Sequence, residues 1–230
     1  MGNIPPFKLE KLQDGECWSI MKEKAFSPGG AVNTTNMTRI GLKIAKKCSG
    51  LPLAAKFLGG LMRSRNEEVD WLSIEENDIW NTLESQSKII PILKLSYDNL
   101  SSELKQCFSY CSIFPKDWEI NRATLVQLWI AEGFLDTCNL ENGRSIEDIA
   151  DEYFESLLWS SFLDCVQQSL LDDIVTCKMH DLVHDLAQAV AGDQALMSLK
   201  ASELNNNSNI RRLQVNVGRG FIINMSEKLK

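Results

Sequence analysis

The sequence predicts a mainly α-helical fold, in which a helical bundle is followed by a winged-helix domain with a short β-wing. Three observations support this prediction. Apolar residues recur every three or four positions along most of the chain, and capping residues stand where these segments begin. Two short apolar runs, residues 162–166 and 174–177, predict a pair of strands joined by a polar turn. A further amphipathic helix is expected to follow from residue 180, which completes a winged-helix order.

Residues 1–94 are expected to form the helical bundle. Leu9–Phe26 has apolar residues at mostly helical spacings, with Asp14 as the expected cap and Trp18 as a buried side chain. Thr34 or Thr35 is expected to cap the next helix, because a hydroxyl there can accept a hydrogen bond from an orphan backbone N–H.

That second helix is expected to end at Gly50, a residue type favoured just past a helix terminus. Pro52 can then occupy the first turn of the following helix, because proline has no N–H to lose there. Residues 50–54 therefore predict a tight helix-to-helix junction. Two more amphipathic stretches follow, around Trp71 and from Ile89.

Residues 95–195 are expected to form the winged-helix domain. Ser101 or Ser102 is expected to cap its first helix, and two further helices are expected to start at Asn121 and at about Ser145. Gly133 is expected to stop the second of these helices. Residues 196–230 are interpreted as a linker, marked by Asn205–Ser208, and a first strand over 210–217.

Charge is unevenly distributed along a chain whose composition, 44% hydrophobic and 24% charged, is typical of globular proteins. Residues 98–198 carry 18 acidic and 5 basic side chains, a net charge of −13, against −7 for the whole chain. Nucleic-acid affinity depends on Lys and Arg that displace counterions from phosphates. We therefore expect no direct nucleic-acid binding, which opposes the interpretation as a winged-helix DNA-binding protein.

The cysteines indicate a reducing, cytoplasmic environment. There are seven, an odd number without a CxxC pair: Cys17, Cys48, Cys107, Cys111, Cys138, Cys165 and Cys177. The spacing of Cys107 and Cys111 within an apolar run favours buried thiols over metal ligands. No run approaches the ~20 apolar residues of a membrane span, and no secretory signal is visible at the N-terminus.

Both histidines of the chain fall within residues 179–186, at the start of the last predicted helix. At about 100° per residue, the apolar side chains from Leu182 onward fill one arc of this helix. His180, Asp181 and His184 are expected on the opposite, polar arc. An imidazole near a helix N-terminus, beside exposed backbone N–H groups, is well placed to meet an anion such as a phosphate.

The spacing of His180 and His184 also resembles the histidine pair of zinc proteases. Asp181 stands where such a site needs a glutamate, and its shorter side chain would miss the metal-bound water. The chain has no third histidine, so a carboxylate or thiolate would have to complete the site. We expect no metal site, and metal analysis of the purified protein tests the zinc alternative.

Four motifs in order resemble plant intracellular immune receptors of the nucleotide-binding, leucine-rich-repeat type. The segment Leu9–Phe26 resembles the motif that opens the helical subdomain of the NB-ARC module, and Gly50–Ala54 resembles the GLPL signature. The segment Cys107–Asp117, continued by Leu128–Phe134, resembles the winged-helix signature. Met179–Asp181 resembles the MHD motif.

The resemblance implies a molecular switch in plant defence that holds ADP at rest and exchanges it for ATP on activation. It implies that Pro52, with Leu53 beside it, packs on the adenine. His180 would contact the ADP β-phosphate, and Asp181 would orient the motif. The implied partners are the nucleotide-binding subdomain and the leucine-rich repeats of an intact receptor. An alternative is an adaptor or decoy that binds such a receptor, which co-purification with one would reveal.

The sequence has no GxxxxGK[ST] loop to cradle phosphates and no apolar strand ending in a magnesium-binding Asp. We therefore expect the chain to be no enzyme by itself and to bind ADP only weakly. Calorimetric titration with ADP should show no micromolar binding, because the loop N–H groups and lysine that supply most of the phosphate affinity are missing. A micromolar dissociation constant would contradict this expectation.

Overall fold

A computed structural model describes the chain over residues 10–82, 89–136, 144–168, 174–192, 195–196, 212–217 and 220–224. The chain divides into two compact units, residues 1–96 and 97–230. Each unit has a hydrophobic core of its own. The predicted fold class is confirmed: the structure is mostly helical and contains two small three-stranded sheets within the described residues.

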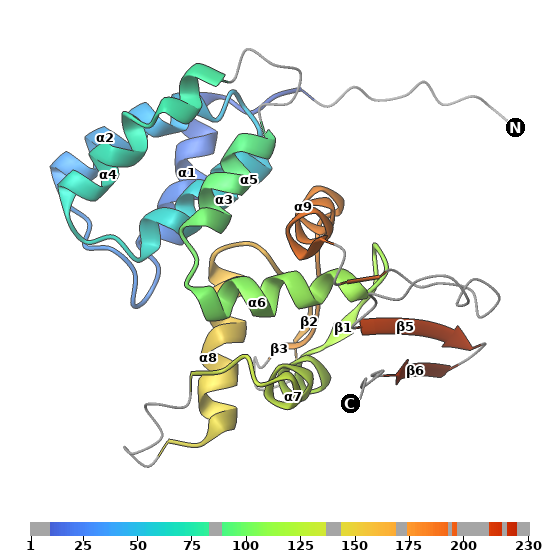
Figure 1. Cartoon of the computed structure of the whole chain (residues 1–230). Helices are drawn as coiled ribbons and strands as arrows, with labels where there is room; N and C mark the ends of the chain where they lie inside the picture. The colour runs from blue at the N-terminus through green and yellow to red at the C-terminus, as the bar shows by residue number, and fades with distance from the viewer. Residues whose placement is uncertain are drawn as a thin grey trace, which may run out of the picture. The chain divides into compact units, whose positions relative to one another are not determined.

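The first unit is built from helices alone in its described part (Figure 1). They are α1 Asp14–Ala25, α2 Thr35–Lys47, α3 Pro52–Arg63, α4 Glu68–Glu75, the 3₁₀ helix η1 Asp78–Thr82 and α5 Ile89–Asp98. Helix α1 packs against both α2 and α3, and α2 packs against α4. The boundary between the two units falls within α5.

Of the two helix caps predicted in this unit, one is confirmed and one is wrong. The Thr34 side chain accepts a hydrogen bond from Met37 N–H at 3.1 Å, which confirms it as the cap of α2. The prediction that Asp14 caps α1 is wrong. Asp14 is the first helical residue, and Gln13, with extended backbone angles, is the cap. Its N–H donates to Glu16 Oε2 at 2.7 Å, so the reciprocal half of a capping box fixes the start.

Trp18 lies in the core of this unit, as predicted, and explains a glycine on the apolar face of α2. Its side chain is 8% exposed. A Cβ built on Gly41 would lie 2.1 Å from Trp18 Cζ3, so α2 can approach α1 only with glycine at this position. In the same unit, the ring of Phe26 stacks on the ring of Trp71, with centroids 5.5 Å apart.

The second unit has the order of elements of a winged helix (Figure 1). It contains α6 Ser102–Tyr110, η2 Cys111–Ile113, β1 Ile120–Asn121, α7 Arg122–Glu132, α8 Ile146–Trp159, β2 Asp164–Gln168, β3 Ile174–Lys178 and α9 Asp181–Ala191. The predicted cap Ser101 and the predicted helix starts at Asn121 and Ser145 are confirmed, since each of these side chains accepts a backbone N–H. Gly133 ends α7 with a φ of 72°.

The wing is an antiparallel hairpin of β2 and β3, as the two apolar runs predict. Strand β1, which the sequence did not predict, pairs with the other edge of β3, so the strand order is β1–β3–β2. Strand β2 starts at Asp164, two residues after the start of the first apolar run. Phe162 and Leu163, the first two residues of that run, are buried before the strand. Strand β3 is therefore the central strand and β2 an edge.

Aromatic rings and thiols fill the core of the second unit. The rings of Phe108 and Phe162 lie 4.6 Å apart. The buried Trp129 Nε1–H donates to Cys107 O at 3.1 Å, so its polar atom is satisfied. The prediction that Cys107 and Cys111 are buried is confirmed, since both are 0% exposed.

The C-terminal residues that the structure describes form a second sheet. Strand β4 Ala195–Leu196 pairs parallel to β5 Arg212–Val217, and β5 pairs antiparallel to β6 Gly220–Asn224. Strand β5 confirms the strand predicted over 210–217. The predicted linker at Asn205–Ser208 lies outside the described residues. Among the helices described, none is long and apolar enough to cross a membrane.

Gly41→Ala should lower the free energy of unfolding by about 1–3 kcal/mol, because the added methyl forces the buried Trp18 ring to move. Denaturant unfolding, followed by tryptophan fluorescence, measures this loss. Leu42→Ala is the matched control, since Leu42 is 41% exposed on the same helix. A Gly41→Ala variant as stable as this control would contradict the packing described here.

Candidate functional site

The start of α9 is fixed by His180 itself. Its backbone is extended, with φ −66° and ψ 145°, and its Nδ1 accepts a hydrogen bond from Leu182 N–H at 3.2 Å. A ring nitrogen that accepts carries no proton, so in this arrangement the neutral ring carries its proton on Nε2. The His180 side chain is exposed. The site therefore offers one imidazole Nε2–H donor at its surface.

The backbone N–H groups at this helix start are mostly occupied. Val183 and His184 both donate to the carbonyl oxygen of His180 at 2.9 Å, and Leu182 donates to its ring. The expectation that exposed N–H groups assist the imidazole is therefore wrong for these three groups. Asp181, the first helical residue, is exposed and adds a negative charge in the first turn. Of the groups described in this paragraph, His180 Nε2 is the one that can contact an anion.

His184 lies in the core, so the expected polar arc of α9 is wrong at this position. Its side chain is 2% exposed, and its Nε2 lies 2.7 Å from the carbonyl oxygen of Phe114. A carbonyl only accepts, so Nε2–H is the donor. Nδ1 of this ring is also buried and has no hydrogen-bond partner among the described residues.

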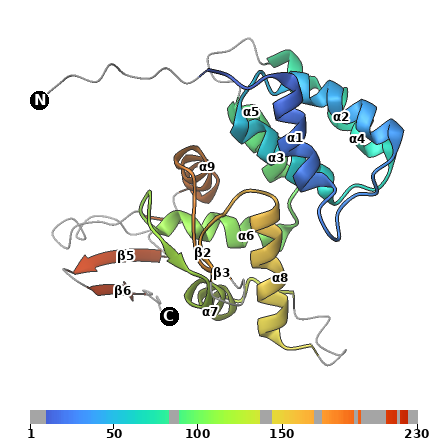
Figure 2. The same ribbon diagram turned by 180° about the vertical axis from the view of Figure 1, so that it is seen from behind.

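The packing of α9 explains why this histidine is buried. The helix contacts both α6 and η2, and it lies beside α6 in both views of the structure (Figure 1, Figure 2). Its buried arc contains Val183 and Ala187 as well as His184, whereas Leu182 and Leu186 are only half-buried. The helix is therefore rotated from the orientation that apolar periodicity predicts.

The hydrogen bond of His184 to Phe114 is one bridge between α9 and the segment after η2. An ion pair of Lys116 and Asp185 forms a second bridge between them. Lys116 Nζ lies 2.5 Å from Asp185 Oδ1, with both side chains about half exposed. The hydrogen bond to Asp185 raises the pKa of Lys116 above its ordinary value. Together with the His184 bond, this ion pair joins two motifs that the sequence showed only as separate signatures.

The winged-helix domain of disease resistance proteins matches residues 113–187, which include both sides of these two bridges. Residues 113–187 belong to this winged-helix family. The match agrees with the element order of the second unit, from η2 through the wing to α9.

Plant disease resistance proteins resemble this chain over most of its length. It is 40% identical over 191 residues to disease resistance protein RGA2 of Solanum bulbocastanum, which covers 83% of the chain and 19% of that protein. It is 38% identical over 217 residues to putative disease resistance protein RGA1 of the same plant, which covers 94% of the chain and 20% of the relative.

In Arabidopsis thaliana, putative disease resistance RPP13-like protein 1 is 34% identical over 185 residues, covering 80% of the chain and 17% of that protein. The chain thus spans about a fifth of the length of the curated relatives it matches. These similarities confirm the resemblance to plant disease resistance proteins that the four sequence motifs indicated.

The predicted adenine-contacting residues lie at the start of α3, in the first unit. Gly50 adopts a φ of 75°, and a Cβ there would lie 2.6 Å from Leu12 O. Leu12 N–H donates to Gly50 O at 3.1 Å, which fixes the turn before the helix. Pro52 is the first helical residue, as predicted, and it is exposed, whereas Leu53 is half-buried. The proline ring is thus accessible within its unit.

The four predicted site residues therefore form two local pairs. Pro52 and Leu53 belong to the first unit, and His180 and Asp181 to the second. The zinc interpretation fails on geometry: His184 Nε2 is bonded to a carbonyl in the core, while His180 is exposed, so the two rings offer no common metal position. Within the described residues, no three His, Cys, Asp or Glu side chains are grouped as metal ligands would be.

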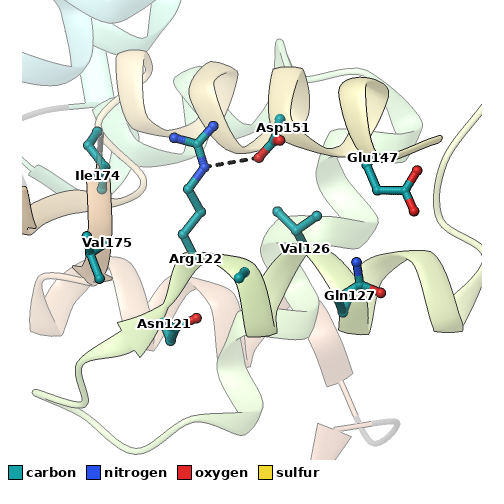
Figure 3. Close-up of a pocket in the computed structure, with 9 residues that line it drawn as sticks. Asn121, Arg122, Val126, Gln127, Glu147, Asp151, Ile174 and Val175 are labelled. Atoms are coloured by element: carbon teal, nitrogen blue, oxygen red, sulfur yellow. Dashed lines mark hydrogen bonds and ion pairs between the residues drawn. The ribbon is translucent and has the colours of Figure 1, made fainter. Parts of the chain in front are cut away.

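A pocket of about 390 Å³ lies between α7, α8 and β3 (Figure 3). The Arg122 side chain extends across it, with Nε 3.0 Å from Asp151 Oδ1 and Nη1 3.1 Å from Glu155 Oε1. The guanidinium also lies over the ring of Phe154, 4.9 Å from the centroid. Two carboxylates neutralise this cation, so the pocket is a poor anion site and Arg122 serves to fasten α7 to α8.

His184→Ala should lower the free energy of unfolding by about 1–3 kcal/mol, because it leaves the buried Phe114 carbonyl without its donor. Urea unfolding of the whole chain, followed by circular dichroism, measures the change. Gln188→Ala, on the same helix but only half-buried, should change stability by less than about 0.5 kcal/mol. Equal effects of the two substitutions would argue against this hydrogen bond.

Proposed function

We propose that this chain is part of a plant intracellular immune receptor in which His180 senses the bound nucleotide. In the resting state, His180 Nε2–H would donate a hydrogen bond to a phosphate oxygen of ADP. The observation that carries the proposal is the use of His180 Nδ1 as a helix cap. The exposed ring then carries its proton on Nε2, and in this form it can donate a hydrogen bond to an anion.

The two bridges from α9 would couple this phosphate contact to the segment after η2. The next turn of the helix holds Phe114 through His184 and Lys116 through Asp185. A phosphate contact at His180 therefore acts on the segment after η2 as well as on α9. A contact made in only one nucleotide state shifts the equilibrium between two domain arrangements by the free energy of that contact. The winged-helix domain would thus respond to the exchange of ADP for ATP.

The other predicted residues take supporting roles in this proposal. Pro52 would pack its exposed ring on the adenine, with Leu53 beside it. Asp181 would orient the MHD segment, and a carboxylate in the first turn of α9 also interacts favourably with the helix dipole. We assign none of these residues to a hydrolytic step. Within an intact receptor, the chain would contact the bound nucleotide without acting as an enzyme itself.

The proposed partners are a nucleotide-binding subdomain and leucine-rich repeats of the same receptor, and the proposed location is the cytoplasm. All six cysteines that the structure describes are free thiols, which is the usual state in a reducing compartment. The acidic charge of residues 98–198 argues for protein partners over nucleic acid.

The test is nucleotide retention by a purified receptor that carries this segment together with a nucleotide-binding fold. His180→Ala should weaken ADP binding about ten- to a hundredfold, because a hydrogen bond to a charged group contributes about 1.5–3 kcal/mol. The amount of ADP released from the denatured protein, measured by chromatography, and the affinity of the refilled protein report this loss.

His180→Asn is the matched variant. Asparagine is a strong helix cap, so α9 should keep its start, but the Nε2–H donor is lost. We therefore expect His180→Asn to weaken ADP binding as His180→Ala does, with a smaller loss of stability. Unchanged ADP binding in both variants would overturn the proposed phosphate contact, even if the receptor remains active in defence.

A further inference from the structure

Two cysteines face each other across the wing. In the β2–β3 ladder, Cys165 is the direct antiparallel partner of Cys177. Directly opposed residues in antiparallel strands have Cα atoms about 4.5–5.5 Å apart, depending on the hydrogen-bonding pattern. A disulfide requires a Cα separation of about 4.4–6.8 Å. The backbone of the hairpin therefore holds this pair within the range that a disulfide needs.

The two thiols differ in their access to solvent. Cys165 is exposed on β2, the edge strand, whereas Cys177 is 0% exposed on the central strand β3. Burial raises the pKa of the Cys177 thiol to about 12, against a smaller opposing effect of the Arg122 charge. Cys165 is thus the thiol that a dissolved oxidant meets first, and Cys177 is the protected partner behind it.

The edge strand has the freedom to close the remaining gap. Opposed Cβ atoms lie about 4.5–5.5 Å apart in such a ladder, whereas disulfide Cβ atoms lie about 3.8 Å apart. The β2–β3 register shifts between Cys165 and Gln167, and among the described strands β2 has a neighbour on one side only. Such an irregularity bends an edge strand locally, so Cys165 can approach Cys177 without movement of the central strand.

We propose that Cys165 and Cys177 form a reversible disulfide when the protein meets hydrogen peroxide. The Cys165 thiol loses its proton, its sulfur attacks one peroxide oxygen, and the O–O bond breaks. The departing hydroxide takes up that proton, so the products are a sulfenic acid and water. The Cys177 thiolate then attacks the sulfenic sulfur, the S–O bond breaks, and the departing hydroxide takes up a proton to form water. Two thiols and one peroxide thus give one disulfide and two waters.

The position of this bond gives it a consequence for the rest of the unit. Cys177 precedes His180 by three residues, through Lys178 and the buried Met179. A disulfide would tie the edge strand of the wing to the segment that leads into α9. The inference needs no bound nucleotide and stands independently of the proposed function.

Peptide mapping of the whole chain tests the proposal. The reduced protein is treated with hydrogen peroxide, its remaining thiols are blocked with N-ethylmaleimide, and it is cleaved before aspartate. Cleavage at Asp164, Asp172, Asp173 and Asp181 places the two cysteines on separate peptides, 164–171 and 173–180. We expect these peptides as one linked species, lighter than their sum by two hydrogen atoms, that dithiothreitol separates.

Two substitutions in the same exposed strand provide the comparison. Cys165→Ser should abolish the linked species and leave Cys177 to be alkylated once the protein is unfolded. Val166→Ser, at a neighbouring position that is 40% exposed, keeps both thiols and should keep the link at full yield. Recovery of Cys165 as a sulfinic or sulfonic acid, or joined to another cysteine, with the Cys177 thiol still reduced would overturn the proposal.

Discussion

The hydrogen bond from His184 to the carbonyl of Phe114 organises the second unit. It joins residues 70 positions apart in the sequence and places α9 against η2 and α6. A buried carbonyl without a donor costs more than a made hydrogen bond contributes, so this contact discriminates strongly against other rotations of the helix. The exposed ion pair of Lys116 and Asp185 then forms at the same junction. Because α9 is held in this rotation, His180 stands at the surface one turn earlier.

Most of the fold was predictable from local sequence signals such as helix caps. The caps Thr34 and Ser101 and the helix starts at Asn121 and Ser145 were predictable because each of these side chains satisfies an N–H within three residues of itself. Asp14 was wrong because the neighbouring Gln13 gains the reciprocal contact with Glu16. Strand β1 has only two residues, which is too short for any periodicity, and it exists because β3 offers a free edge.

Motif resemblance pointed to Pro52, Leu53, His180 and Asp181 as candidate site residues, and the structure places each pair at a helix start. Their arrangement was not predictable from the sequence. The burial of His184 depends on an acceptor 70 residues away, and helical periodicity treats every histidine as polar. The pairing of Arg122 with Asp151 and Glu155 likewise follows from how α7 crosses α8. Such long-range pairs leave no signal in a single sequence.

One histidine lies in the core and the other at the surface, so the NMR signals of the two imidazole rings report on two different parts of the second unit. Imidazole protons resonate apart from most other side-chain signals, and this chain has only these two rings. One ring, bonded to Phe114, reports whether the second unit is folded, and the other reports what approaches the start of α9. A ligand that shifts one signal and leaves the other in place has bound without unfolding the domain, and no label has to be introduced to see it.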